Sequence, residues 1–255
     1  MFPRRLRGNM PCRQACFLLS WVSAMRDEVI VKPKPIKRFK HRRVLYVPCD
    51  SPEGIIYKFI KKDILAEKNL GFGHLILLQD KTILYQSVGA SAAVLAFEPL
   101  IASGATEIIM LGFCGSLNVQ YKYLKAAVIT KALSEEGTSR HYFPKRRIFY
   151  PSPKLKKIIE KALQRRRLSF YQGSLVSTDA PYRETRSWLE RQQAKGIDFV
   201  DMEASAVFAL AEYHGIDAAA MMIISDELTS KKWKTGFKYP RMLRRIIDYF
   251  FPFLS

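Results

Sequence analysis

The segment of residues 199–228 constrains the fold more strongly than any other part of this sequence. From residue 203 to residue 214 apolar side chains recur at helical spacing, and Gly215 follows where a helix is expected to end. Residues 218–224 then form an almost unbroken apolar run, which is typical of a strand buried on both faces. A helix joined to such a strand predicts an α/β fold.

Two acidic residues flank this predicted helix and strand. Glu203 stands at the start of the helix, and Asp226 comes just after the strand. In open α/β sheets, ligands bind at the carboxyl ends of the strands. The pair therefore indicates a binding or catalytic site, although either acid could instead serve only as a helix cap or as a partner of a helix dipole.

The rest of the chain from residue 44 alternates strand patterns with helical ones, which by itself predicts a largely parallel sheet covered on both faces. Two predicted strands end in small-residue loops, one containing Gly89 and the other containing Gly112, Phe113 and Cys114. Glycines let the backbone approach a ligand, and a helix N-terminus can hold an anion. We therefore expect these loops to contact substrate.

Four motifs, in this chain order, resemble those of the nucleoside phosphorylase-I family: Glu-Glu-Gly-Thr-Ser-Arg-His-Tyr at 135–142, Ser-Thr-Asp at 177–179, Val-Asp-Met-Glu-Ala at 200–204 and Ser-Asp at 225–226. The family includes purine nucleoside phosphorylase, uridine phosphorylase and methylthioadenosine/adenosylhomocysteine nucleosidase. The resemblance implies an α/β fold in which a single domain has a mixed, partly barrel-like central sheet flanked by helices. This domain would span residues 44–255 and follow a basic N-terminal extension, residues 1–43.

The resemblance also implies roles for individual residues. Asp226 would be the general acid that protonates a purine base as it leaves the sugar. Glu203 would accept hydrogen bonds from the ribose hydroxyls and stabilise the cationic sugar of the transition state, with Met202 packed on the sugar. Since uridine-specific relatives lack the acid, Asp226 favours a purine-type nucleoside.

Residues 177–185 would form the base side of the site. By resemblance, Ser177, Thr178 and Asp179 line the base pocket. The family commonly has an aromatic residue two positions after this aspartate, where the present sequence has proline. Tyr182 follows that proline and is the candidate for stacking on the base, so the stacking residue stays open.

The phosphate side of the site departs from the family pattern. Phosphorylases of this family hold phosphate with an arginine and a serine, and Met110 and Phe113 occupy these places here. Neither side chain can bind an oxyanion. Glu53 falls where the nucleosidase branch has a glutamate that activates water, although it could equally be an ordinary first-turn helix acid. Glu53 is therefore a candidate general base.

These observations leave three functions open. The wider family favours a purine nucleoside phosphorylase, which produces free base and ribose-1-phosphate with inorganic phosphate as co-substrate and no other cofactor. The replaced phosphate positions favour a nucleosidase, a hydrolase that uses water instead. The third possibility is a non-enzymatic binding protein, because 42 lysine and arginine residues against 23 aspartate and glutamate residues give a net charge of +19.

The remaining expectations concern partners and location. Family resemblance implies a homo-oligomer, either a dimer or a trimer of dimers, in purine salvage. Nucleic acid is a possible partner that the retained acids do not favour. The scattered cysteines and histidines indicate a reducing, cytoplasmic setting without a metal site. We expect no membrane partner, since the apolar run in residues 1–24 is short, and translation could begin at Met25.

Overall fold

The computed structural model describes residues 29–37, 39, 41–49, 54–230, 233–236 and 240–254. The predictions for residues 1–24 and for Glu53 lie outside the described residues. The chain divides into two units, residues 1–33 and residues 34–255, and the second unit contains all the helices and strands that follow. None of the helices described is long and apolar enough to cross a membrane.

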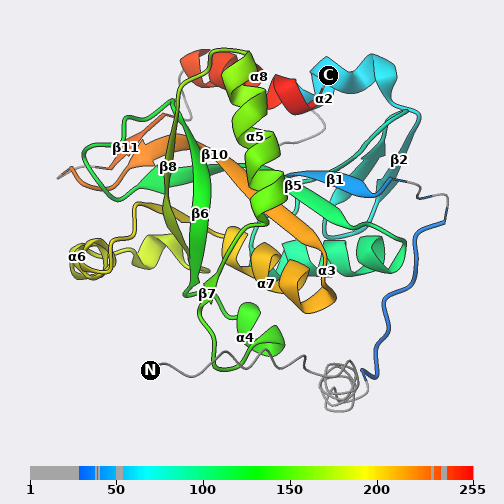
Figure 1. The fold of residues 1–255 in the computed structure, drawn as a ribbon, viewed down its shortest axis with the longest axis horizontal. Helices are drawn as coiled ribbons and strands as arrows, with labels where there is room; N and C mark the ends of the chain where they lie inside the picture. The colour runs from blue at the N-terminus through cyan, green and yellow to red at the C-terminus, as the bar shows by residue number, and fades with distance from the viewer. Residues whose placement is uncertain are drawn as a thin grey trace, which may run out of the picture. The chain divides into compact units, whose positions relative to one another are not determined.

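The described residues form one sheet of eleven strands with helices on both faces (Figure 1). The elements are, in chain order, β1 (Arg43–Val47), α2 (Ile55–Ile60), the 3-10 helix η1 (Lys61–Asp63), β2 (Ala66–Asn69), β3 (His74–Leu77), β4 (Thr82–Tyr85), α3 (Ala90–Ala102), β5 (Glu107–Ser116), β6 (Ala126–Ser134), α4 (Ser139–Tyr142), β7 (Ile148–Phe149), α5 (Pro153–Arg165), β8 (Phe170–Ser177), the 3-10 helix η2 (Pro181–Arg183), α6 (Arg186–Ala194), β9 (Phe199–Asp201), α7 (Ala204–His214), β10 (Asp217–Glu227), β11 (Lys234–Thr235) and α8 (Pro240–Leu254).

Part of the sheet closes on itself as a barrel. β5 pairs with β10, β10 with β6, β6 with β8, β8 with β9, and β9 returns to β5. The β10–β6 and β9–β5 pairings are antiparallel. The mixed, partly barrel-like sheet that the resemblance implied is therefore confirmed, and the largely parallel sheet predicted from strand–helix alternation alone is wrong.

The barrel is joined to an open sheet through β5. The first residues of β5, from Glu107 to Met110, pair with β1, whereas Gly115 and Ser116 at its end pair with β9. β4, β3 and β2 extend the open part beyond β1, and β11 pairs with the end of β10. β5 and β10 lie side by side along their whole length, so they carry the wall between the two parts.

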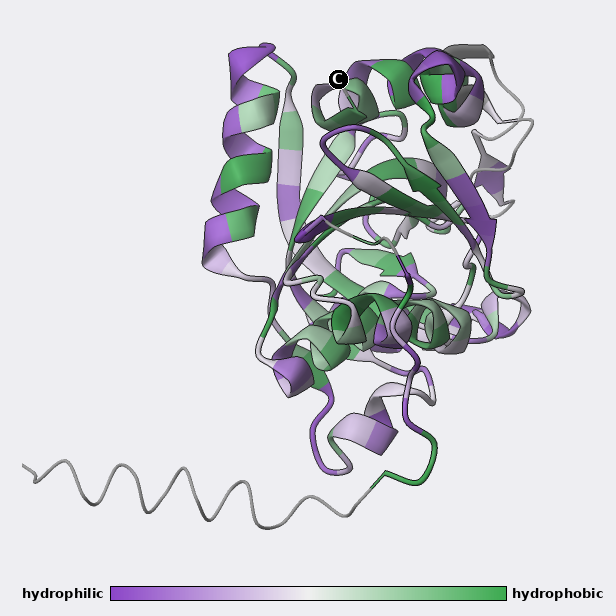
Figure 2. Cartoon of the chain, turned by 90° about the vertical axis from the view of Figure 1, so that its right-hand side faces the viewer, coloured by the Kyte–Doolittle hydropathy of each residue, from purple (hydrophilic) through white to green (hydrophobic). Residues whose placement is uncertain are grey.

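The two faces of the sheet bury two separate apolar cores. Val44 and Tyr46 of β1 pack on the side of α3 and α7, whereas Leu45 and Val47 pack on the side of α2, α5 and α8. Figure 1 shows α3 and α7 on the lower side and α5 and α8 on the upper side, and Figure 2 shows the largely hydrophobic strands between them. Strands covered on both faces need apolar residues at every position, which explains their unbroken apolar runs.

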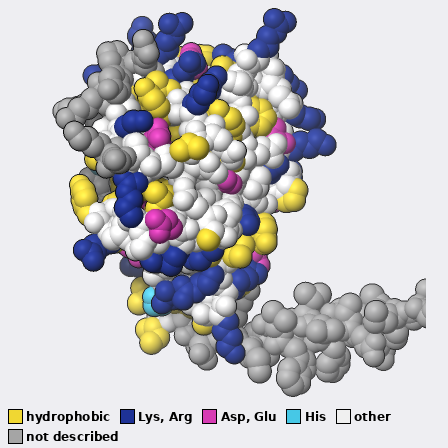
Figure 3. All heavy atoms as spheres, turned by 90° about the vertical axis from the view of Figure 1, so that its left-hand side faces the viewer, with side chains coloured by type: hydrophobic (Ala, Val, Ile, Leu, Met, Phe, Trp, Pro, Cys, Tyr) yellow, Lys and Arg dark blue, Asp and Glu magenta, His cyan; other side chains and the backbone are white. Residues whose placement is uncertain are grey.

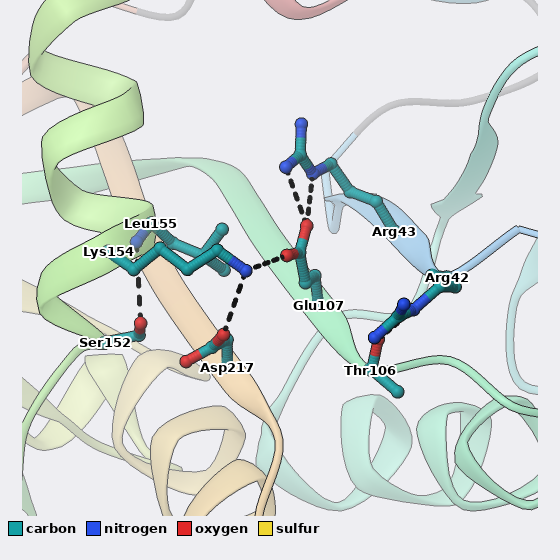
Figure 4. Close-up of polar contacts among 8 residues, drawn as sticks. All are labelled: Arg42, Arg43, Thr106, Glu107, Ser152, Lys154, Leu155 and Asp217. Atoms are coloured by element: carbon teal, nitrogen blue, oxygen red, sulfur yellow. Dashed lines mark hydrogen bonds and ion pairs between the residues drawn. The ribbon is translucent and has the colours of Figure 1, made fainter.

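A charged cluster holds together the amino ends of three strands (Figure 4). Glu107 of β5 accepts from Arg43 of β1 at 2.6 Å and from Lys154 of α5 at 2.5 Å, and Lys154 lies 3.6 Å from Asp217 of β10. Burial alone would raise the pKa of Glu107, but hydrogen bonds from Lys154 and Arg43 outweigh it and lower that pKa. The cluster lies at the opposite strand ends from the two acids of the predicted site.

The predicted helix–strand unit is present as α7 and β10. α7 ends at Gly215, whose φ of 67° is the left-handed conformation that glycine adopts without a steric cost. At the other end, the side chain of Asp201 accepts a hydrogen bond from the N–H of Ala204 at 2.8 Å. Asp201 thus satisfies the first N–H of the helix, and Glu203, which is the N-cap residue, makes no side-chain capping bond.

Candidate active site

A cavity of about 500 Å³ lies at the carboxyl ends of β5, β9 and β10. Its lining comes from segments far apart in the sequence: Cys49, Val88, Phe113, Cys114, Gly115, Pro181, Tyr182, Glu184, Thr185, Arg186, Leu189, Val200, Asp201, Met202, Glu203, Ser225, Asp226, Leu228 and Trp233. The structure thus brings together six of the predicted site residues, namely Phe113, Cys114, Tyr182, Met202, Glu203 and Asp226.

Glu203 lies at the floor of the cavity, where it is only 4% exposed. Its Oε1 accepts a hydrogen bond from the N–H of Gly89 at 2.6 Å. Gly89 precedes α3 with a φ of 92°, a conformation that strains any residue with a side chain. Burial raises the pKa of Glu203 to about 8, assisted by the charge of Asp201 and opposed by hydrogen bonds from the N–H groups of Gly89 and Met202.

Asp201 is a site residue that the sequence reasoning missed. It lies two residues before Glu203, is 6% exposed, and accepts a hydrogen bond from the hydroxyl of Ser177 at 2.6 Å. Burial raises the pKa of Asp201 to about 7, against the hydrogen bonds from Ser177, Ala204 and Glu203 that lower it. Its position in the Val-Asp-Met-Glu-Ala motif, at the end of a buried strand, was the available signal.

Ser177 belongs to a buried polar network below the cavity and is absent from the cavity lining. Its hydroxyl oxygen accepts from the N–H of Ser205 at 2.9 Å, and the Ser205 hydroxyl donates to Glu136 at 2.9 Å. Glu136 also accepts from the Ser134 hydroxyl at 2.8 Å and from the Ser139 N–H at 3.0 Å. These hydrogen bonds connect the start of α7 to the segment after β6 and give partners to the buried polar groups of both.

Thr178 and Asp179 are likewise absent from the lining of the cavity. The N–H of Thr178 donates to the carbonyl of Asp201 at 3.0 Å, and Asp179 accepts from the N–H of Gly137 at 2.8 Å. These contacts tie the segment after β8 to β9 and to the loop after β6. In this structure both residues support the frame of the site from outside the cavity.

Asp226 faces the cavity from the end of β10. Its Oδ1 accepts from the hydroxyl of Ser225 at 2.6 Å, and its Oδ2 accepts from the indole N–H of Trp233 at 2.8 Å. Both donors fix the carboxyl group in one orientation. Trp233 itself is 63% exposed, so an aromatic ring stands beside the acid at the mouth of the cavity.

Glu184 is the second site residue that the sequence reasoning missed. It is half-buried in the segment between η2 and α6 and lines the same cavity as Asp226. Burial raises the pKa of Glu184 to about 7, with a further contribution from the negative charge of Asp226. Nothing in the polar sequence of this segment distinguishes Glu184 from its neighbours, because its proximity to Asp226 arises only in the folded chain.

The predicted loop residues differ in how they contribute. Gly112 is absent from the lining, and a Cβ at this position would lie 2.9 Å from Sδ of Met222, so Gly112 is needed for packing β5 against β10. Cys114 lines the cavity, and burial followed by the charges of Asp226 and Asp201 raises the pKa of its thiol. The Cys114 thiol therefore stays protonated.

Arg186 is the one basic side chain among the described residues that line the cavity. Its guanidinium donates to the carbonyl of Leu228 at 2.9 Å and to the carbonyl of Ser230. Both contacts hold the segment after β10. In the described part of the chain, no group of three or more histidine, cysteine, aspartate or glutamate residues is arranged to hold a metal ion.

Comparisons with known proteins agree with this arrangement. The family model described as the Phosphorylase superfamily matches residues 64–241. A guanosine phosphorylase of Halorubrum lacusprofundi is 30% identical over 158 residues, which cover 61% of this chain and 64% of that protein. A DeoD-type purine nucleoside phosphorylase of Clostridium novyi is 25% identical over 178 residues, which cover 65% of this chain and 76% of that protein.

Solved structures show the same fold. A purine nucleoside phosphorylase of Toxoplasma gondii superimposes with a TM-score of 0.73 at 19% identity, over 91% of this chain and 98% of that chain. An AMP nucleosidase of Bacteroides thetaiotaomicron gives a TM-score of 0.68 at 18% identity, over 83% of this chain and 87% of that chain. The resemblance drawn from the four motifs is confirmed: this chain belongs to the phosphorylase superfamily, whose members include nucleoside phosphorylases and nucleosidases.

Proposed function

We propose that this protein cleaves the N-glycosidic bond of a purine nucleoside. The observation that carries the proposal is that Glu203 and Asp226 open into one cavity of about 500 Å³, a size suited to a small ligand. Cleavage of this bond places positive charge on the sugar and negative charge on the departing base. Two carboxyl groups on different walls can serve these two charges separately.

In this proposal Glu203 binds the ribose. Its Oε1 accepts from the N–H of Gly89, and its carboxyl group lines the cavity, where it would also accept from a ribose hydroxyl. The ionised carboxylate accepts stronger hydrogen bonds than the neutral acid does, and it alone carries the negative charge that stabilises a cationic sugar. The pKa of Glu203 is raised to about 8, so without substrate its carboxyl group is mostly protonated at neutral pH. A hydrogen bond donated by the substrate would lower this pKa and favour the charged form. Met202, which also lines the cavity, would pack against the sugar.

Asp226 and Glu184 would act on the base. Asp226 would donate a proton, or share one, with the base as it leaves, and Ser225 and Trp233 hold it in position. Glu184 offers a second carboxyl group on the same side of the cavity. A 2-amino-6-oxopurine has two adjacent N–H donors, at N1 and at the 2-amino group, which match the two oxygens of the Glu184 carboxylate, whereas adenine does not. We therefore propose guanosine-type substrates. Tyr182, which is 97% exposed at the mouth, would cover the bound base.

The geometry of the described lining favours water as the acceptor, and hence a nucleosidase. Four carboxyl groups, those of Glu184, Asp201, Glu203 and Asp226, face or border this cavity. Arg186, the one cation in the described lining, already donates to backbone carbonyls. A phosphate dianion would be repelled by these acids without a compensating cation. Glu53, which lies outside the described residues, stays our candidate for the base that activates water.

Phosphorolysis is the second candidate, and the names of the curated relatives favour it. Inorganic phosphate would then be the co-substrate, ribose-1-phosphate would be the product, and Glu203 and Asp226 would keep the same roles. A basic residue from a second copy of the chain in a homo-oligomer could supply the missing cation. No cofactor is needed in either reaction.

One experiment separates these candidates. The full-length protein is incubated with guanosine, inosine, adenosine and methylthioadenosine, each with and without phosphate, and base release is followed by chromatography. We expect base release without phosphate, with free ribose as the sugar product. Base release that depends on phosphate and yields ribose-1-phosphate would establish the second candidate. Absence of base release from every nucleoside would instead favour a non-enzymatic role.

A further inference from the structure

A second concave surface lies on the other side of the end of β10. It is an open cavity of about 700 Å³ between the segment after β5 and the helix α8, and we call it the basic groove. Its lining consists of Val119, Tyr121, Lys122, Tyr123, Leu124, Lys125, Glu227, Arg244, Arg245 and Asp248. Asp226 lines the cavity of the candidate active site, whereas the next residue, Glu227, lines the basic groove. The two differ because successive side chains of a strand point to opposite faces.

The charge of the basic groove is positive after its internal ion pairs are counted. Its two acids already have cationic partners, since Asp248 lies 3.2 Å from Arg245, and Glu227 lies 3.7 Å from Lys234. Lys122 and Arg244 are exposed, and neither makes an ion pair with any residue that the structure describes. Within the described part of the chain, two cations without an ion-pair partner therefore face solvent, Lys122 from the segment after β5 and Arg244 from α8.

The positive surface continues beyond the groove along the end of α5. The Arg165–Arg166–Arg167 run is exposed, and the guanidinium of Arg166 lies 5.1 Å from the ring centre of Phe251 in α8. Ser169 accepts from the ammonium group of Lys125 at 2.8 Å, which connects this run to the groove. Figure 3 shows lysine and arginine side chains spread over the face seen from the side of β11 and α6, with few acidic side chains between them.

An aromatic side chain accompanies these cations. Tyr123 is 43% exposed in the groove, and Val119 beside it is 78% exposed. The neighbouring Tyr121 is anchored in the core, with its ring centre 5.0 Å from that of Tyr171 and 4.7 Å from that of Phe199. The segment that carries Tyr123 is therefore held in place before any ligand binds, which lowers the entropy cost of binding.

We propose that the basic groove binds single-stranded nucleic acid. Lysine and arginine side chains along a groove neutralise successive phosphates, and an exposed tyrosine between them offers a face on which a base can stack. A chain with a pI of about 9.9 and clustered cations has the charge that such partners require. Nucleic-acid binding by the groove is independent of the proposed nucleoside cleavage, because no residue of the groove lines the cavity of the candidate active site.

The test measures fluorescence anisotropy of a labelled 20-nucleotide single-stranded RNA with the full-length protein at several salt concentrations. The groove variant is Lys122→Glu/Arg244→Glu, and the matched control is Lys61→Glu/Lys62→Glu at two exposed lysines of η1. We expect the groove variant to bind at least about 10-fold more weakly and to lower the slope of log affinity against log salt by about 1.4, as loss of two phosphate contacts predicts. Tyr123→Ala should weaken binding by about 5-fold or more.

Three outcomes would overturn the proposal. The first is no binding of RNA by the wild-type protein at 50 mM salt. The second is equal weakening in the groove and control variants, which would show a general effect of net charge. The third is binding to vesicles of phosphatidylcholine and phosphatidylserine without binding to RNA, which would assign the surface to anionic membranes. Cleavage of guanosine by the groove variant should equal that of the wild type, so failure of either proposal can be recognised separately.

Discussion

Replacing Glu203 with glutamine tests whether the site holds this carboxyl group in an environment that resists its ionisation. Glu203 is 4% exposed, and its Oε1 accepts from the N–H of Gly89 at 2.6 Å. Burial and the charge of Asp201 raise the pKa of Glu203 from the ordinary value of 4.5 to about 8. Glutamine keeps a carbonyl oxygen for Gly89 and removes the charge, so Glu203→Gln isolates the electrostatic contribution.

The sign of the effect follows from which state holds the proton. Between pH 4.5 and about 8 the native wild type keeps a proton on Glu203 that the unfolded chain has released. The free energy of unfolding of the wild type therefore falls as pH rises through this window, and the loss is complete above the folded-state pKa. Glu203→Gln lacks this loss, so its stability relative to the wild type should increase with pH.

The magnitude can be bounded from the same values. One pKa unit corresponds to about 1.4 kcal/mol, so the raised pKa of Glu203 gives an upper limit of about 5 kcal/mol. Part of this free energy comes from repulsion between the Glu203 and Asp201 carboxylates, and Asp201 remains in the variant, where it becomes easier to ionise. We therefore expect Glu203→Gln to gain about 2–4 kcal/mol relative to the wild type between pH 5 and pH 9. Any cost of burying the new amide is the same at both pH values and cancels.

Urea unfolding followed by tryptophan fluorescence at pH 5 and pH 9 measures this gain. Glu190→Gln, at an exposed position of α6, serves as the matched control, and its difference from the wild type should stay within about 0.5 kcal/mol at both pH values. A stability difference for Glu203→Gln that does not change with pH would refute the reasoning, since it would mean that Glu203 ionises as easily in the native state as in the unfolded chain.

Three further predictions concern neighbouring residues. Asp201→Asn keeps an acceptor for the Ala204 N–H but removes a negative charge beside Glu203, which should lower the pKa of Glu203. Because the ionised Glu203 is the active form, the rising limb of the pH profile of kcat/KM should move to lower pH. Glu184→Gln should lower kcat/KM for guanosine relative to inosine by about 10-fold, because the amide cannot accept from two adjacent N–H donors. Gly112→Ala would place a Cβ 2.9 Å from the flexible end of the Met222 side chain, so urea unfolding should show a loss of about 1 kcal/mol.

Much of the fold could be predicted because its signals are local. The periodicity of residues 203–214, Gly215 after them and the apolar run before Asp226 each specify one element without reference to the rest of the chain. The barrel could not be predicted from periodicity. It depends on β9, a strand of three residues, pairing with both β5 and β8, and so short a strand has no pattern of its own.

The same difference between local signals and contacts made by folding applies to the candidate site. Glu203 and Asp226, which line one cavity in the structure, could be singled out because each lies at the end of a recognisable element and within a family motif. Glu184 could not be ranked above other acids, because its raised pKa comes from burial and from the charge of Asp226, which folding brings near. Asp201 had a signal in its motif, but the burial that raises its pKa is a property of the folded chain. The positions of Ser177, Thr178 and Asp179 show the converse. Their motif identified a segment near the site, but the side chains of Ser177 and Asp179 and the backbone N–H of Thr178 bind the surrounding frame.

Glu203 and Asp226 perform the cleavage in the proposed function. The decisive measurement is the rate of guanine release from guanosine by the wild type, Asp226→Asn and Glu203→Gln. Glu227→Gln is the matched control, because this adjacent carboxylate faces the basic groove. We predict that both site variants lose about 100-fold or more in kcat/KM and that the control stays within about 2-fold of the wild type. Turnover by Asp226→Asn equal to that of the wild type would show that Asp226 does not act on the leaving base.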